Sequence, residues 1–427
     1  MEKRKNILVL AYMVSPYRGS EYSVAWNYII NMSEYNNLTV LYGTSGNHLG
    51  DNTDLEEYLR INSVPNVDFI FVKPDKTAMT LNWLNTHDIL RYTFYLAYNA
   101  WHKQVYRIAK RIVDTQNIDL IHYLGPIGYR EPGYLWKLDK PYMWGPIAGT
   151  CNYPYVLRKC LSMKSFIKYQ TRSIINDFQL KHSKRLKRAL SACDVLLTAT
   201  TEAQDKFMRI HNRSSVYLPE NGIVAANSSD SIADKFGGGI IELVFIGRID
   251  GLKNLGLLLA ALTKIDDIGK LHLNIVGDGT ERAKLEAYAR MHGLSERLTW
   301  HGQQKREKVF KILDKSHLHV ITSLQEGNAT VVFEAMAHGV PTLTLDHCGM
   351  HDTICDDCGF KIPIVSYEQV VADITDTLQR CIDNPDILKT KAEETVKCAE
   401  NYLWDKRKPV FLECYDEAIR KFEERHK

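Results

Sequence analysis

The sequence has no long hydrophobic run, and this absence limits the kinds of protein it can encode. No stretch approaches the roughly 20 consecutive apolar residues that a membrane-spanning helix needs. The N-terminal apolar run, residues 6–12, is short and leads into Pro16, Arg18 and Gly19 without the small-residue cleavage site of a signal peptide. We interpret it as a buried strand and expect a cytoplasmic protein that touches a membrane only at its surface.

A strong excess of one charge is also lacking. Lys and Arg number 54 against 51 Asp and Glu, a net charge of +3 for 427 residues. This balance does not favour nucleic acid as a partner. An apolar fraction of 45% and a charged fraction of 25% are typical of a folded globular chain, and the length favours two domains.

Cysteine is sparse, with nine residues spread over the chain, which is unlike a secreted disulfide scaffold. We therefore expect a reducing compartment. One local group, His347, His351, Cys355 and Cys358, has a spacing that could hold zinc. Because no second Cys pair accompanies it, we expect these side chains to pack in a turn-rich loop, without a metal.

Short apolar runs alternate with helical patterns along the whole chain, which is typical of βαβ units and parallel sheets. The strands expected in the first half are 6–12, 37–43, 67–73, 119–124, 141–147 and 195–200. Those expected in the second half are 241–247, 271–277, 298–302, 318–323 and 341–346. A polar stretch at 225–239 separates the two series. We predict an α/β protein of two Rossmann-like domains that face a cleft, with ligands beyond the carboxyl ends of the strands.

Two cations, Arg248 and Lys253, follow the expected strand 241–247 in the loop GRIDGLKN. A strand end, two cations and a helix N-terminus together favour an anion such as a diphosphate. The alternative is that the two side chains only solvate a loop. After strand 271–277, Gly277 and Asp278 begin the turn GDGTER, in which Arg282 replaces the third glycine of a dinucleotide fingerprint. This turn could form one wall of a nucleotide-binding pocket, or it could simply be a tight turn.

Two glutamates flank the start of an expected helix in SLQEGNATVVFEAMAHGVPTL. Glu326 precedes Gly327 in a loop, where the small residue lets backbone N–H groups approach a ligand, and Glu334 lies inside the helix. Carboxylates can accept hydrogen bonds from adjacent hydroxyls, so the pair suits polyols. Capping or solvated glutamates are the alternative. Gly19, in SPYRGSEYSVAWNY, repeats a strand-to-helix turn in the first half and could present N–H groups to a ligand.

Taken in order and spacing, FIGRIDGLKN, IVGDGTER and EGNATVVFEAMAHGVP resemble the C-terminal domain of GT4-type retaining glycosyltransferases of the GT-B fold. The most specific part is the element from Glu326 to Glu334, followed by AMAHGVP. PYRGSE, WGPIAG, LPENGI and YLWDKRKPVFLECYDEAI extend the resemblance over nearly the whole chain. DHCGMHD looks like bacterial members that build capsular polysaccharide or exopolysaccharide.

The resemblance implies roles for particular residues. Arg248 and Lys253 match the pair that binds the donor diphosphate, Glu326 the residue that contacts the transferred sugar, and Glu334 the one that holds the ribose. Gly19 matches a glycine near the phosphates. The other residues expected to bind the sugar-nucleotide donor are Gly247, Gly277, Asp278, Gly327 and Asn328. The resemblance also implies a UDP- or GDP-linked sugar donor, no metal and no other cofactor.

The chain departs from the family at a histidine. Relatives often carry His-x-His-x-Pro after the fourth expected strand, whereas here only His122 is present and Leu124 takes the second position. His122 is therefore either an acceptor-side residue or a core residue, and Arg130 and Glu131 just beyond it are further acceptor-side candidates.

The acceptor side carries a basic stretch, residues 158–188, with ten Lys or Arg and one acid interleaved with apolar residues. Such a stretch favours an anionic membrane surface and a polyprenyl-diphosphate-linked glycan acceptor. We predict an acceptor domain at 1–220, a sugar-nucleotide domain at 221–400 and a helix at 401–427 that crosses back to the first domain.

The predicted function is that of a hexosyltransferase in cell-surface polysaccharide synthesis. The alternatives are a sugar-nucleotide 2-epimerase, which would need no acceptor site, and a non-catalytic sugar-nucleotide-binding protein, against which the four intact motif residues argue.

Overall fold

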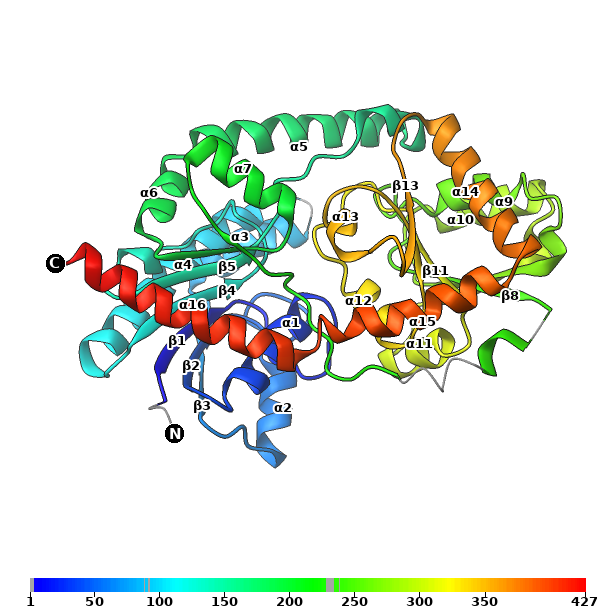
Figure 1. The fold of residues 1–427 in the computed structure, drawn as a ribbon. Helices are drawn as coiled ribbons and strands as arrows, with labels where there is room; N and C mark the ends of the chain where they lie inside the picture. The colour runs from blue at the N-terminus through cyan, green and yellow to red at the C-terminus, as the bar shows by residue number, and fades with distance from the viewer. Residues whose placement is uncertain (1–3, 88, 91–92, 228–233, 238) are drawn as a thin grey trace. The chain divides into compact units, whose positions relative to one another are not determined.

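The computed structural model describes residues 4–87, 89–90, 93–227, 234–237 and 239–427, and they form two compact units (Figure 1). The first unit contains residues 1–150, 178–222 and 407–427, and the second contains 151–177 and 223–406. Within the described residues, no helix is long and apolar enough to cross a bilayer.

The first unit is built on a seven-stranded parallel sheet with the order β3-β2-β1-β4-β5-β6-β7. Its strands are nearly continuous apolar runs because helices cover both faces of such a sheet. Four consecutive residues of β1, from Ile7 to Leu10, are fully buried. The strands are β1 (Asn6–Ala11), β2 (Asn37–Tyr42), β3 (Val67–Phe71), β4 (Leu120–Gly125), β5 (Tyr142–Ile147), β6 (Val195–Thr198) and β7 (Val216–Tyr217).

The helices of this unit follow the strands in sequence. They are α1 (Glu21–Met32), α2 (Thr53–Ile61), α3 (Lys76–Thr86), α4 (Thr93–Thr115), α6 (Lys184–Ala192), α7 (Thr201–His211) and most of α16 (Trp404–Arg425). The C-terminal helix α16 lies beside α1 (Figure 1), where Tyr28 and Tyr415 share a hydrogen bond between their hydroxyl groups.

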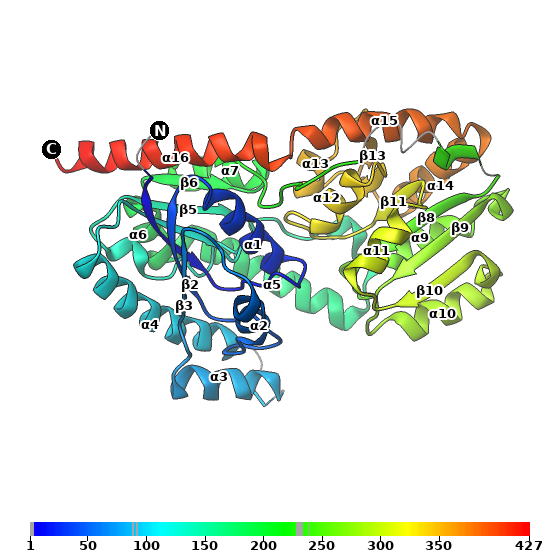
Figure 2. The same cartoon turned by 90° about the horizontal axis from the view of Figure 1, so that it is seen from below.

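The second unit repeats this plan with a six-stranded parallel sheet of order β10-β9-β8-β11-β12-β13. Its strands are β8 (Ile241–Ile246), β9 (Leu271–Val276), β10 (Leu298–Gly302), β11 (Leu318–Ile321), β12 (Thr342–Leu345) and β13 (Gly359–Ile362). Its helices are α9 (Leu255–Leu262), α10 (Arg282–Met291), α11 (Arg306–Leu313), α12 (Thr330–Ala337), α13 (Gly349–Thr353), α14 (Tyr367–Asp383) and α15 (Asp386–Glu400). Figure 2 shows α15 running along α12 on one side of this sheet.

Both sheets place the first strand of their unit beside the fourth, so the chain moves outward in both directions from this pair. This arrangement confirms the predicted α/β class with two Rossmann-like units. In open sheets of this kind ligands bind where the strand order reverses, which here lies between β1 and β4 in the first unit and between β8 and β11 in the second.

The compact units differ from the contiguous domains expected from the sequence. Residues 151–177 group with the second unit, because Tyr153, Leu157 and Leu161 pack into the hydrophobic core formed around β8, β9 and α14. The long helix α5 (Met163–His182) therefore contributes residues to both units.

Candidate active site

The loop after β8 presents its two predicted cations differently. The Asp250 carboxylate accepts hydrogen bonds from the backbone N–H groups of Leu252 (3.0 Å) and Lys253 (2.9 Å), which fixes the turn before α9. The Arg248 side chain is 74% exposed, with Nη2 3.2 Å from Asp250 Oδ2. Arg248 is thus exposed to solvent, while Lys253 turns inward.

Lys253 and Glu326 form an ion pair in which the ammonium group donates to Oε2 of the carboxylate. The two residues come from the carboxyl ends of β8 and β11, and their side chains are only 22% and 18% exposed. The structure therefore brings together two of the three predicted catalytic residues. An anionic ligand at this position would compete with Glu326 for the charge of Lys253.

Two hydrogen bonds join the loops that carry this pair. The N–H of Leu324 donates to the carbonyl of Leu252 at 2.8 Å, and Thr322 Oγ1 donates to the carbonyl of Asn254 at 2.9 Å. Gly327 and Asn328 lie in the loop between Glu326 and α12. The ion pair thus lies on two loops that are hydrogen-bonded to each other.

Close backbone approach explains the glycines after β9. A Cβ atom at Gly277 would lie 1.9 Å from the carbonyl oxygen of Gly247, and one at Gly279 would lie 2.3 Å from that of Ile249. Gly277 also has a positive φ of 133°. The GDG turn therefore serves to pack one loop directly on the loop that holds Arg248.

Asp278 and Arg282 of this turn face each other, with Nη1 of Arg282 3.0 Å from Oδ2 of Asp278. Arg282 also pairs with Glu286 at 2.8 Å, one turn along α10. The residue that breaks the dinucleotide fingerprint therefore holds the predicted donor residue Asp278 in place.

Glu334 is the fifth residue of α12 and pairs with Arg306, the first residue of α11, at 2.8 Å. The Glu334 side chain is 15% exposed, and burial raises the pKa of its carboxyl, while the Arg306 charge acts to lower it. Arg306 was missed by sequence reasoning. Its only signal is a basic residue at the start of a helix, which many surface helices share.

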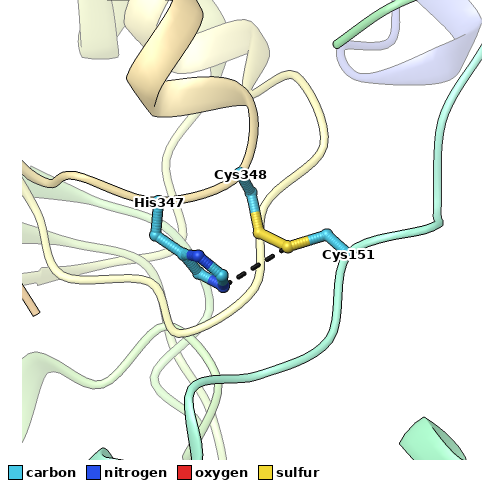
Figure 3. A group of neighbouring side chains, drawn as sticks. All are labelled: Cys151, His347 and Cys348. Atoms are coloured by element: carbon cyan, nitrogen blue, oxygen red, sulfur yellow. Dashed lines mark hydrogen bonds between the residues drawn. A yellow bond between two sulfur atoms is a disulfide. The ribbon is translucent and has the colours of Figure 1, made fainter. Parts of the chain in front are cut away.

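A disulfide joins Cys151 and Cys348 in the second unit (Figure 3). His347 Nε2 lies 3.3 Å from the Cys151 sulfur and 2.9 Å from the carbonyl oxygen of Asn152. Gln325, beside Glu326, donates to the carbonyl of Cys151. A disulfide was not expected, because the cysteine content had favoured a reducing compartment. The two cysteines are 197 residues apart in sequence, so their spacing did not indicate that they pair.

The four residues weighed as a zinc site do not come together. His347 groups with the disulfide, Cys355 and Cys358 group with Cys398, and His351 Nδ1 instead lies 2.6 Å from Asp346.

In the first unit, the loop after β1 is anchored by Arg18, which makes a two-point ion pair with Asp54 at 2.5 and 3.2 Å. Gly19 and Ser20 follow, and the carbonyl of Ser20 accepts the first hydrogen bonds of α1. Burial raises the pKa of Glu21 to about 7, in a cavity of about 20 Å³ that Tyr12 and Glu220 also line. Such a carboxyl can exchange protons near neutral pH, a property that the sequence motifs did not reveal.

His122 lies in the core, which corrects its assignment as an acceptor-side residue. It is fully buried on β4, its Nε2 donates to the carbonyl of Gly145 at 2.8 Å, and its Nδ1 lies 2.9 Å from the Tyr28 hydroxyl. Burial lowers its pKa to about 4. Both ring nitrogens are thus occupied by the protein, and the ring has no face toward a substrate.

The other two acceptor-side candidates follow β4 in the loop before β5. The Glu131 carboxylate pairs with Arg185 of α6, while burial raises the pKa of Glu131 and the Arg185 charge opposes the shift. The Arg130 guanidinium lies over the Tyr129 ring, 5.9 Å from its centroid. The Glu131–Arg185 ion pair binds the loop to α6.

Comparison with known proteins agrees with this geometry. Residues 233–395 match the family model "Glycosyl transferases group 1". The chain is 23% identical over 304 residues to an uncharacterized glycosyltransferase of Methanocaldococcus jannaschii, covering 70% of this chain and 76% of that protein. It is 30% identical over 173 residues to the lipopolysaccharide 1,6-galactosyltransferase of Escherichia coli, covering 40% and 47%.

Among solved structures, Anabaena HepE in complex with UDP and glucose matches with a TM-score of 0.61 at 15% identity, covering 96% of this chain and 99% of that one. The shared architecture establishes the GT-B fold. The match of residues 233–395 to the group 1 family model supports a glycosyltransferase.

Proposed function

We propose that this protein is a GT4-type retaining glycosyltransferase that transfers a hexose from a nucleotide sugar to a polyprenyl-diphosphate-linked glycan in cell-surface polysaccharide synthesis. The Lys253–Glu326 ion pair at the carboxyl ends of β8 and β11 carries this proposal, because it joins a diphosphate-binding cation to a sugar-binding carboxylate. It lies inside the segment that matches the group 1 family model.

The donor is a UDP- or GDP-linked sugar. A solved structure of similar fold, Anabaena HepE, is a complex with UDP and glucose, which supports a nucleotide sugar as the donor here. Arg248 and Lys253 bind the diphosphate, Glu326 the sugar hydroxyls and Glu334 the ribose. Gly19, Gly247, Gly277, Asp278, Gly327 and Asn328 complete the donor set.

The chemistry is a displacement on one face of the sugar. The bond from the anomeric carbon to the phosphate oxygen breaks, and a bond to the acceptor oxygen forms on the same face. The acceptor hydroxyl gives its proton to the departing phosphate, since none of the motifs supplies a covalent nucleophile. Arg248 and Lys253 stabilise the charge that develops on the leaving diphosphate, which makes a metal or other cofactor unnecessary.

The acceptor is held at an anionic membrane surface by residues 158–188. Three apolar side chains of α5, Met163, Ile167 and Ile174, recur at helical spacing and are 73%, 57% and 60% exposed. Lys164 and Lys168 lie between them in sequence. An exposed apolar row with adjacent lysines favours a lipid surface with acidic head groups. We accordingly place the protein in the cytoplasm, peripheral to the cell membrane.

A donor screen tests the function. Purified protein is heated with UDP- and GDP-sugars, with and without Mg²⁺, beside a Glu326→Ala variant. A ligand at a hundred times its Kd stabilises by about 2.7 kcal/mol, so a metal-independent rise in Tm with one nucleotide is expected. Product analysis then separates transfer from epimerisation and from binding alone. A protein that no nucleotide sugar stabilises contradicts the proposal.

A further inference from the structure

Three cysteine side chains of the second unit lie together, separate from the donor loops and from the disulfide. The sulfur atoms of Cys355, Cys358 and Cys398 all lie within 4.8 Å of one another. Cys355 and Cys358 belong to the segment between α13 and β13, and Cys398 lies in the last turn of α15. Cys358 is buried and the other two are partly buried.

Backbone hydrogen bonds orient the first two sulfur atoms. The N–H of Cys355 donates to Cys358 Sγ, and the N–H of Cys358 donates to Cys355 Sγ, each at 3.1 Å. An N–H group that donates to sulfur favours the thiolate, which is the form that binds metal. Each of the two sulfur atoms in this turn is therefore held in place by a backbone N–H group of the other cysteine.

The same turn is fastened to α15, the helix that carries the third sulfur. Thr395 Oγ1 donates to the carbonyl of Cys358 at 3.0 Å, and Lys391 Nζ donates to the carbonyl of Asp356 at 2.8 Å. Lys361 pairs with the Asp356 carboxylate at 2.9 Å. These contacts hold the two parts of the cluster in register and supply positive charge beside it.

The distances suit a tetrahedral thiolate site. Zinc binds thiolates at about 2.3 Å, which places two ligand sulfurs about 3.8 Å apart. Sulfur atoms within 4.8 Å of one another therefore need to approach by at most about 1 Å.

We propose that Cys355, Cys358 and Cys398 bind one Zn²⁺ ion through three thiolates, with water as the fourth ligand. Binding releases the three thiol protons and changes no oxidation state. The ion would join the 355–358 turn to α15. This proposal stands independently of the sugar-transfer activity.

The test uses the full chain, reduced, freed of metal and titrated without oxygen, first with Co²⁺ and then with Zn²⁺. We expect one equivalent of Co²⁺ to give the near-ultraviolet absorption of sulfur-to-cobalt charge transfer, and Zn²⁺ to displace it. Cys355→Ser and Cys398→Ser should each weaken Zn²⁺ binding at least tenfold. Far-ultraviolet circular dichroism of each metal-free variant checks that it is folded.

Two matched variants locate the metal. Cys381→Ser removes another buried thiol, on α14. Cys151→Ser removes one cysteine of the disulfide, which together with His347 forms the second group of potential metal ligands. Both should bind Zn²⁺ as the unmodified chain does. Loss of binding in Cys151→Ser with retention in Cys398→Ser overturns the assignment. So does a reduced chain that binds less than one equivalent of Zn²⁺, or a Cys355–Cys358 disulfide in protein purified without reductant.

Discussion

Single residues at the ends of β8 and β11 determine how the site responds to a charged ligand. The Lys253 ammonium is neutralised by Glu326 while both side chains are mostly shielded from water. In the proposed function, a donor diphosphate would share or replace this contact, whereas the sugar would use the carboxylate itself. Lys253 should therefore strengthen binding of a nucleoside diphosphate that carries no sugar, whereas Glu326 should weaken it.

Separate substitutions of the two partners should show this difference. We expect Lys253→Ala to weaken binding of UDP or GDP at least tenfold, because a hydrogen bond to a charged group contributes about 1.5–3 kcal/mol. Glu326→Gln should bind the same nucleotide as tightly or more tightly, because it frees Lys253, yet lower sugar transfer by about a hundredfold. Calorimetry measures the first quantity and product formation the second.

Lys270→Ala serves as the control, since Lys270 pairs with Asp267 at 2.8 Å on the surface and is 53% exposed. It should leave both quantities unchanged. If Glu326→Gln weakens nucleotide binding as much as Lys253→Ala does, the two residues do not compete as argued.

His122 makes a second prediction at this scale, concerning pH. Burial lowers its folded-state pKa from 6.5 to about 4, so between these values the unfolded chain takes up a proton that the folded chain refuses. Stability therefore falls as the pH drops through this range. From pH 7 to pH 5 the loss from this one group is about 2 kcal/mol.

Urea unfolding of the parent chain and His122→Gln at several pH values isolates this contribution. His102 and His319 have pKa values lowered in the same direction, and Glu21 has a raised one, which opposes them between about pH 4.5 and 7. These groups are common to both chains, so the stability difference between them should shrink by about 2 kcal/mol. A difference that is constant with pH would refute a buried neutral His122.

At the scale of elements, the turn after β9 supports the loop after β8. Gly277→Ala would force a Cβ into the Gly247 carbonyl, and we expect it to lower the free energy of unfolding by at least about 2 kcal/mol. Because Gly247 precedes Arg248, nucleotide affinity should fall too. Denaturant unfolding and calorimetry measure the two effects.

Gly19→Ala is the matched control for this prediction. Outside its chain neighbours, no heavy atom of the described residues would lie within 4 Å of the added Cβ. Its stability should stay within about 0.5 kcal/mol of the parent chain. Equal stability of the two alanine variants would show that the loops are not packed as described.

Elements also show what the sequence could and could not predict. Parallel strands buried on both faces form continuous apolar runs, so all the strands from β1 to β6 and from β8 to β12 could be predicted. β7 was missed because it has only two residues, and β13 because its four residues include Lys361 and directly follow the cysteines and aspartates at 355–358. The pairing of Lys253 with Glu326 and of Cys151 with Cys348 joins distant segments, so only the tertiary structure reveals it. His122 is buried because β4 is covered on both faces, whereas the motif had left two interpretations of this residue open.

At the scale of the whole molecule, the chain is nearly neutral, yet its basic residues gather along 158–188. In this stretch α5 exposes an apolar row beside lysines. A surface of this kind gains affinity for a membrane from two sources, apolar insertion and charge, which separate variants can remove one at a time.

Vesicle sedimentation should resolve these two sources. We expect the parent chain to bind vesicles rich in phosphatidylglycerol and not vesicles of phosphatidylcholine. Lys164→Glu with Lys168→Glu should weaken binding at least tenfold, since each basic residue near an anionic surface contributes about 1 kcal/mol. The double variant Ile167→Ser with Ile174→Ser should weaken vesicle binding at both low and high salt, because apolar insertion persists where salt screens the charges.

Ile61→Ser supplies the control, because Ile61 lies at the end of α2 and is 81% exposed but lies outside the basic stretch. If it reduces vesicle binding as much as the α5 variants do, binding is a general effect of exposed apolar side chains. If only the α5 variants lose binding while donor binding stays intact, the lipid surface and the sugar nucleotide are recognised by separate parts of the chain. A lipid-linked acceptor would then meet the enzyme through α5, and the donor would enter through the loops of β8 and β11.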